Sequence, residues 1–152
     1  MSLEWVKVIF VSMLPVSELR GSIPYAMLLG LSPAEAYAIS VIGNFIPVPV
    51  VLFILKKFDP FFRRIPYLGS IYVRILGIGE KRKRIVEKYG YPGLTVFVAI
   101  PLPVTGAWTG TLISFLLGLN TKKASLFILA GILIAGLIVT SATYGIKLAF
   151  FR

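Results

Sequence analysis

The sequence predicts an all-α integral membrane protein with a single membrane domain over residues 1–152. Hydrophobic residues make up 57% of the chain, and its mean hydropathy is +0.89. A soluble domain of this length has too much surface for its volume to bury that much apolar material. The apolar residues also form four blocks separated by short charged stretches, which is typical of a chain that enters the membrane several times.

The first block, residues 5–31, and the third, residues 91–119, are each too long for one untilted span and too short for two. Proline, glycine and polar residues interrupt both blocks, as PVSELRGSIP and PLPVTGAWTGT. Ten helical residues rise about 15 Å, which is half of the membrane core, so each block fits a re-entrant helical hairpin. One long, proline-kinked span per block is the alternative. The residues expected to shape the two turns are Pro15, Gly21, Pro24, Pro101, Pro103, Gly106 and Gly110.

The second block, residues 34–55, and the fourth, residues 124–151, each have the length of one transmembrane helix. The segments LPVSELRGSIPYAMLLGL (14–31) and LPVTGAWTGTLISFLLGL (102–119) share LPV and LLGL at one offset, without a gap. We therefore predict two copies of one unit, a hairpin followed by a span, over residues 4–56 and 91–151. A hairpin returns to its own side and the span then crosses, so the second copy is inverted, as in many transporters.

The net charge is +10, and the basic residues are unevenly placed. Twelve of the sixteen lie in residues 56–88 or in the NTKK loop. By the positive-inside rule, the connector (57–90) is cytoplasmic and both termini lie outside a multi-pass protein of the cell membrane. Apolar residues at helical spacing from Leu68 to Leu76 predict an amphipathic helix in this connector, with its cations toward anionic lipid headgroups. Nucleic acid is not an expected partner.

Glu18 and Arg20 lie inside an apolar block, where each charge costs about 2.5–3.5 kcal/mol at the membrane centre. Two interpretations stay open. The two side chains form a salt bridge that only fixes the turn, or they form a site. In such a site Arg20 binds a phosphate or carboxylate group, and Glu18, partly desolvated, carries a proton.

Other polar residues near the predicted turns are candidates for the same site. The second turn carries hydroxyl groups that could line a polar path, while Trp108 packs against a substrate or against the other hairpin. Asn44 reaches the first turn or bonds a backbone group freed by a nearby proline. The candidate substrate- or proton-binding residues are Glu18, Arg20, Asn44, Thr105, Trp108 and Thr109. Without cysteine, histidine or an acidic cluster, we expect no metal, no cofactor, no catalytic residue and no enzyme activity.

The motifs ELRGSIP, GN with nearby prolines, and PLPVTGAWTG resemble the small multidrug export protein family, over nearly the whole chain. That family looks like a distant branch of the DedA-like (VTT-type) membrane proteins. The resemblance implies two opposed re-entrant hairpins and movement of lipids, including polyprenyl phosphates, with proton dependence. It also implies that Glu18 responds to protons and that Arg20 contacts a headgroup. DedA-like proteins carry essential arginines in their second half, whereas the second turn here has none, so a phosphate would rest on Arg20, alone or with a partner chain's arginine.

The sequence therefore predicts a small transporter or flippase for an amphipathic anion, in the first place a lipid phosphate, with proton coupling. A proton-coupled exporter of lipophilic cationic drugs is one alternative, although Arg20 would repel such a cation. A non-transporting structural membrane protein is the other alternative. A homodimer is expected, because small residues in the hairpins permit close packing of helices. These small residues are Gly21, Ser22, Gly106 and Gly110.

Overall fold

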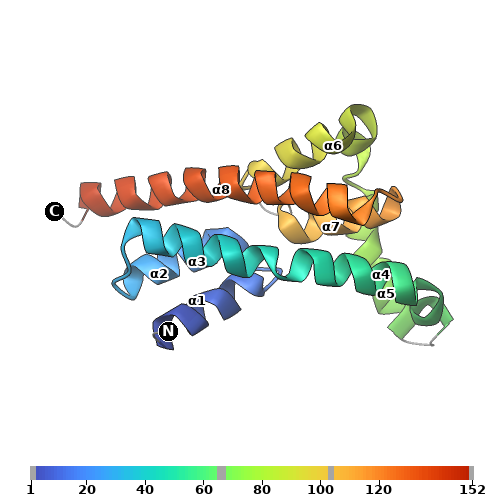
Figure 1. Ribbon diagram of the computed structural model, residues 1–152, viewed down its shortest axis with the longest axis horizontal. Coiled ribbons are helices and arrows are strands. Elements are labelled where there is room, and N and C mark those ends of the chain that lie inside the picture. The colour runs from blue at the N-terminus through green and yellow to red at the C-terminus, as the bar shows by residue number, and fades with distance from the viewer. Residues whose placement is uncertain (1–2, 65–67, 103–104, 151–152) are drawn as a thin grey trace.

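The computed structural model describes residues 3–64, 68–102 and 105–150, and all regular structure in these ranges is helical (Figure 1). The helices are α1 (Leu3–Met13), α2 (Glu18–Leu28), α3 (Pro33–Phe45), α4 (Pro47–Arg64), α5 (Leu68–Glu80), α6 (Arg84–Ala99), α7 (Ala107–Leu116) and α8 (Thr121–Phe150). Within these ranges, two stretches are long and apolar enough to cross a membrane, Pro33–Phe61 and Thr121–Ala149. The prediction of an all-helical protein with two long apolar helices is confirmed.

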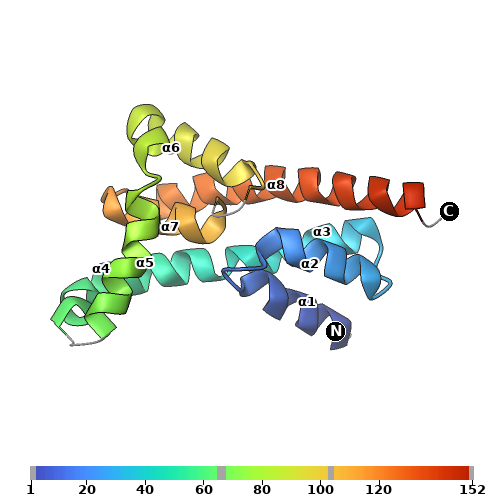
Figure 2. The same cartoon turned by 180° about the vertical axis from the view of Figure 1, so that it is seen from behind.

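The two long apolar helices run side by side in opposite directions, α3 and α4 one way and α8 the other (Figures 1 and 2). Helices α1 and α2 form a hairpin that packs on α3, and α6 and α7 form a second hairpin that packs on α8. The turns of both hairpins lie near the middle of the molecule (Figure 1). Each hairpin thus precedes one long helix in the chain, in the order that the sequence repeat predicts.

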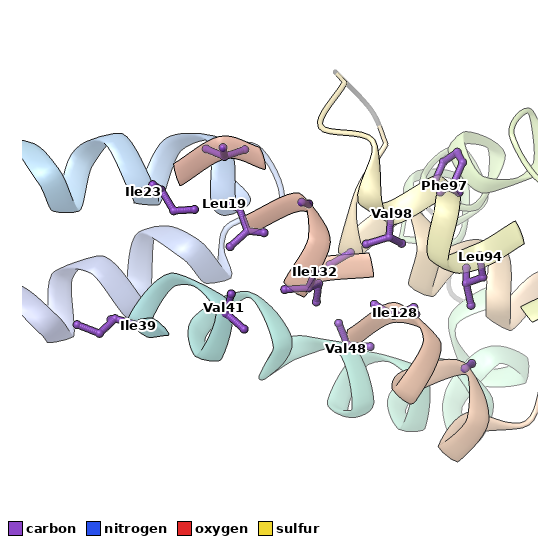
Figure 3. Packing of buried hydrophobic residues seen from close by; sticks show 14 of the residues in the cluster. Leu19, Ile23, Ile39, Val41, Val48, Leu94, Phe97, Val98, Ile128 and Ile132 are labelled. Carbon is purple, nitrogen blue, oxygen red and sulfur yellow. The ribbon is translucent and has the colours of Figure 1, made fainter. Parts of the chain in front are cut away.

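A continuous apolar core joins the two hairpins to the long helices. Fully buried side chains from both units take part, among them Ile23 of α2, Leu94 of α6, and Ile128 and Ile132 of α8. Figure 3 shows this core gathered around Ile128 and Ile132. The outer faces of the long helices carry exposed apolar side chains such as Phe53 and Leu126, which suit a lipid environment.

Two glycines let each hairpin approach its long helix closely. A Cβ atom added to Gly43 of α3 would lie 1.9 Å from the Ser12 hydroxyl oxygen of α1. A Cβ atom added to Gly131 of α8 would lie 2.6 Å from the Val98 Cβ of α6. Gly43 and Gly131 occupy matching positions in the sequence repeat, so a glycine permits a close approach of helices at the same place in both units.

The shared LLGL segments adopt the same local structure. In each, a glycine with positive φ ends the helix: Gly30 at 86° and Gly118 at 63°. The N–H of the following leucine donates to the carbonyl five residues earlier, at 3.1 Å in the first copy and 2.9 Å in the second. This is the Schellman motif, in which glycine avoids the steric penalty of left-handed backbone. The sequence repeat therefore corresponds to repeated helix ends in the fold.

The connector differs from the single amphipathic helix that we predict from its sequence. It comprises the end of α4, helix α5 and the first part of α6. Helix α5 packs on α4 and α7 with Tyr72 and Leu76 buried, whereas Ile71 and Ile75 of the predicted apolar face are largely exposed. Within α6, Gly90 has φ 64° and ψ −141°, a backbone conformation that strongly favours glycine, and it kinks the helix.

Candidate functional site

The turns of the two hairpins contact each other through Arg20 of α2. Its guanidinium donates one hydrogen bond to the carbonyl of Leu102 and another, of 2.8 Å, to the carbonyl of Thr105. A planar guanidinium presents several N–H groups in a fixed fork, which suits two acceptors at once. Arg20 therefore joins the start of α2 to the turn between α6 and α7.

Glu18 makes a second connection between the turns. Its side chain is buried, and one carboxylate oxygen accepts a hydrogen bond of 3.2 Å from the backbone N–H of Trp108. Trp108 lies in the first turn of α7, whose N-cap position is Gly106, a residue without a capping side chain. A helix N-terminus has unpaired N–H groups and a partial positive charge, so Glu18 takes the place of the missing cap.

Gly106 makes room for that carboxylate. A Cβ atom added at Gly106 would lie 2.0 Å from the nearer Glu18 carboxylate oxygen. Gly106 also has φ 138°, which other residues rarely adopt, and Glu18 itself has a positive φ of 44° at the start of α2. Both turns therefore have an uncommon backbone conformation at the residues where they touch, a pattern often found at functional sites.

The direct ion pair between Glu18 and Arg20 is long. The nearest nitrogen and oxygen are 3.4 Å apart, whereas a strong charge-assisted hydrogen bond is about 2.7–2.9 Å. Each charge makes its closer contact with the backbone of the other turn. The two side chains therefore join the hairpins to each other, in addition to pairing within the first turn.

A cavity of about 750 Å³ lies beside the charged pair. That volume is in the range of small-molecule sites, about 300–1,000 Å³. Its walls come from both turns and from α5, which contributes Ile75 and Ile78. The sequence-predicted residues that line it are Pro15, Glu18, Arg20, Gly21, Thr105, Trp108 and Thr109. The fold thus brings five of the six candidate binding residues to one cavity.

Asn44, the sixth candidate, lies on the other side of the pair. It is buried in α3 and lines a second, much smaller space together with Glu18, Arg20 and Thr105. That space has room for about one water molecule. The amide oxygen of Asn44 has no hydrogen-bond partner among the described residues. Asn44 therefore reaches the surroundings of the first turn, and its amide oxygen is free to accept a hydrogen bond there.

The Thr105 hydroxyl is occupied within its own turn. It lies 2.6 Å from the carbonyl of Ile100 and 2.7 Å from the carbonyl of Leu102. The N–H of Leu102 donates back to the same hydroxyl oxygen at 3.1 Å. Thr105 therefore shapes the loop that offers two carbonyls to Arg20, in addition to lining the cavity with its side chain.

The remaining turn predictions divide into three groups. Pro15, Pro101 and Gly106 lie in the turns as expected, whereas Gly21 and Pro24 lie inside α2 and Gly110 lies inside α7. Both helices begin earlier than the breaks in the sequence suggest. Pro103 lies outside the described residues.

The small residues expected at a dimer interface pack mainly inside the protomer. Ser22 is fully buried, Gly106 faces Glu18, and a Cβ atom at Gly110 would lie 2.7 Å from Val98. These residues therefore serve contacts between helices of one chain. The homodimer stays a prediction, and these residues no longer support it.

The Trp108 indole forms a hydrogen bond in the reverse direction, from the second hairpin to the first. Its Nε1–H donates to the carbonyl of Met13 at 3.0 Å. Replacing Trp108 by phenylalanine keeps an aromatic ring but leaves that carbonyl unpaired, so we expect a loss of about 1 kcal/mol in the free energy of unfolding. Circular dichroism during denaturation in detergent measures it. Trp5→Phe is the control, since Trp5 is partly exposed on α1, and an equal loss in both variants would contradict the prediction.

The family comparison covers most of this site. A family model described as "Putative small multi-drug export protein" matches residues 18–138. The chain belongs to this family. The match begins at Glu18, the first residue of α2, includes the turn between α6 and α7 and ends within α8. It therefore contains Glu18, Arg20 and their partners in the second turn, whereas the turn before α2 precedes it. The description of the family and the two long apolar helices together indicate a membrane protein of an export family. Comparisons with curated proteins and with solved structures gave no match.

Proposed function

We propose that the protein transports an amphipathic anion, in the first place a lipid phosphate, through the cavity beside Glu18 and Arg20. The observation that carries this proposal is the position of Arg20. Its guanidinium borders a cavity with mostly apolar walls, and its side chain is still 27% exposed. An amphipathic anion matches such a cavity, since its charged group can bind the guanidinium while its chain contacts the apolar wall. The proposal is transport, without a chemical reaction.

The membrane placement in this proposal follows from helix lengths. Helix α2 has 11 residues and rises about 16 Å, roughly half of the membrane core. The two hairpins would then be re-entrant, with their turns meeting at mid-depth between two antiparallel spans. Such an inverted arrangement places a substrate site at the interface of the repeats. The basic connector would lie on the cytoplasmic side with both termini outside, and the relation to DedA-like proteins stays a prediction.

In the proposed transport cycle, the anion replaces two backbone carbonyls as the hydrogen-bond acceptor of Arg20. Arg20 is already bound to the carbonyls of Leu102 and Thr105. A phosphate is a stronger acceptor than a neutral carbonyl, because it carries a negative charge and can accept two parallel N–H bonds from one guanidinium. Binding of the phosphate would therefore release the second turn from Arg20 and let the two hairpins separate.

Protonation of Glu18 would favour the same step. The carboxylate occupies the N-terminus of α7 and lies beside Arg20, so it competes with any incoming anion for the same donors. A proton on Glu18 removes its negative charge and weakens its contact with the Trp108 N–H. Anion binding and proton binding would then support each other, which is the basis of the proposed proton coupling.

Export of lipophilic cations is the second candidate function, and the family description favours it. Glu18 would then exchange its proton for the drug. The geometry opposes this function, because Arg20 lies 3.4 Å from the carboxylate and repels a second cation. In addition, the Glu18 side chain is only 6% exposed, so a cation would have to open the contact with Gly106 to reach it.

The test compares wild type with Arg20→Ala in proteoliposomes, using a short-chain fluorescent polyprenyl phosphate. We expect wild type to move this lipid between leaflets and Arg20→Ala to lower the rate by about tenfold or more, the value of a hydrogen bond to a charged group. Arg74→Ala, an exposed arginine on α5, is the matched control. The second readout is efflux of a fluorescent cationic dye.

The outcomes separate the candidate functions. Lipid movement that requires Arg20 supports the anion transporter. No lipid movement by folded wild type, together with dye efflux that tolerates Arg20→Ala but not Glu18→Gln, supports the cation exporter. Folded wild type that moves neither probe contradicts transport of both classes and favours the structural alternative.

A further inference from the structure

A second groove, of about 500 Å³, lies on the other face of the α6–α7 turn. Four cations line it, Lys81, Arg82, Arg84 and Lys88. Its apolar side is formed by residues of α6 and of the following turn, among them Phe97, Ile100 and Leu102. The groove therefore combines a dense positive charge with an apolar surface, and no step of the proposed transport cycle uses it.

The two carboxylates near these four cations both pair with one other lysine, Lys83. Lys83 pairs with Glu80 at 2.6 Å and with Glu87 at 3.3 Å. The hydrogen bonds that Lys83 donates to these carboxylates raise its pKa above the ordinary value. Lys81, Arg82, Arg84 and Lys88 form no ion pair among the residues that the structure describes, so their charge stays available to a ligand. Lys88 lies over the ring of Tyr89, 5.0 Å from its centroid, which leaves its charge in place.

The kink in α6 creates the groove. The four cations precede Gly90, together with Ile85 and Tyr89, whereas Phe97, Ile100 and Leu102 follow it. A straight helix would carry these two sets away from each other along its axis. The positive φ of Gly90 turns the chain, and the bend of α6 is visible in Figure 1. Both sets of residues therefore line one groove. An added Cβ atom at Gly90 meets nothing within 4 Å, so the requirement for glycine is conformational.

The groove ends at the backbone that covers Arg20. Leu102 and Thr105 line it, and their carbonyls accept the two hydrogen bonds from Arg20. Thr105 also lines the cavity beside the charged pair. A ligand in the groove would therefore lie against the loop that must move before Arg20 can bind an anion.

We propose that this groove is the loading site for the lipid phosphate, with the phosphate on the four cations and the lipid chain along Phe97, Ile100 and Leu102. Phosphate groups bind clustered arginine and lysine side chains through charge-assisted hydrogen bonds, and basic pockets beside membrane helices bind lipid headgroups in this way. The groove would hold the lipid on the cytoplasmic side before it passes to Arg20. This inference rests on the proposed function for the transfer, whereas binding in the groove is independent of transport.

The experiment compares two variants that lose the same charge. In the groove variant, Lys81, Arg82, Arg84 and Lys88 become glutamine. In the control variant, Lys57, Arg74, Lys122 and Lys123 become glutamine; these four are also exposed, and none lines the groove. The probe is the short-chain fluorescent polyprenyl phosphate. Binding is measured by anisotropy in nanodiscs of zwitterionic lipid, and transport is measured in proteoliposomes of the same lipid.

We expect the groove variant to bind the probe about tenfold more weakly than wild type or worse, and the control variant to remain within about twofold. All eight residues are on the surface, so both variants should fold, and equal unfolding midpoints verify this. An equal loss of binding in both variants would mean that the probe responds only to the net charge of the protein, and it would overturn the proposal. Wild-type binding by the groove variant, or no binding by wild type, would also overturn it.

The two readouts separate this inference from the proposed function. If wild type binds the probe through the groove but does not move it between leaflets, the loading site stands and the transport proposal fails. If wild type transports the lipid and the groove variant does so with an unchanged half-saturation concentration, the transport proposal stands and the loading site is wrong.

Discussion

Replacing Gly106 by alanine is expected to separate the two turns and to abolish transport. The new Cβ atom would lie 2.0 Å from a Glu18 carboxylate oxygen, so the carboxylate has to leave the N-terminus of α7. The backbone at φ 138° adds a strain of about 1–3 kcal/mol for a residue with a side chain. With the loss of the charged hydrogen bond to Trp108, we expect the free energy of unfolding to fall by about 3 kcal/mol or more.

The unfolding midpoint in detergent measures this loss, and lipid movement in proteoliposomes measures the effect on function. Gly145→Ala is the matched control, because Gly145 lies in α8 and an added Cβ atom there meets nothing within 4 Å. If Gly106→Ala unfolds at the same midpoint as Gly145→Ala, the close contact between the two turns is wrong.

Exchanging the two charges, as Glu18→Arg with Arg20→Glu, is expected to destabilise the protein, although one positive and one negative side chain remain and the net charge is unchanged. After the exchange, a guanidinium would face the N–H of Trp108, and a carboxylate would face the carbonyls of Leu102 and Thr105. Donors would then face donors and acceptors would face acceptors. Each unpaired charged contact costs about 1–3 kcal/mol, so we expect a total loss of about 3 kcal/mol or more, together with loss of transport.

An exposed ion pair provides the control for this exchange. Glu80 and Lys83 pair on the surface of the connector, and Lys83 also pairs with Glu87. Because surface ion pairs contribute little, exchanging Glu80 and Lys83 should lower the free energy of unfolding by less than about 1 kcal/mol. Full stability and full lipid movement in the Glu18–Arg20 exchange would mean that the two side chains act only on each other. That result would contradict the contacts between the turns.

Much of the architecture could be predicted from the sequence. The lengths of the apolar blocks predict two hairpins and two long helices, because helix length is tied to membrane thickness. The LLGL repeat predicts matching helix ends, because glycine is favoured at the left-handed position where such helices stop. Glu18 and Arg20 could be selected as candidates because charges in an apolar block are costly.

Other parts of the site could not be predicted from the sequence. The partners of Glu18 and Arg20 are backbone groups of Leu102, Thr105 and Trp108, and a backbone group has no sequence signature. The kink at Gly90 was missed for a related reason. The apolar periodicity of the connector is seen from Leu68 to Leu76 and does not extend to Gly90, and a single glycine does not indicate which backbone conformation it adopts. The basic groove depends on that kink, so its cations looked like one exposed face of a helix.

The hydrogen bonds described between the two turns have one property in common: each joins a side chain of one hairpin to the main chain of the other. A peptide group offers the same donor and acceptor whatever residue carries it. We therefore expect little residue covariation between the turns in related chains, because a substitution at Leu102 or Met13 requires no compensating change across the contact. Coevolution-based contact maps would then be sparse at this point, even though the two halves of the protein meet there.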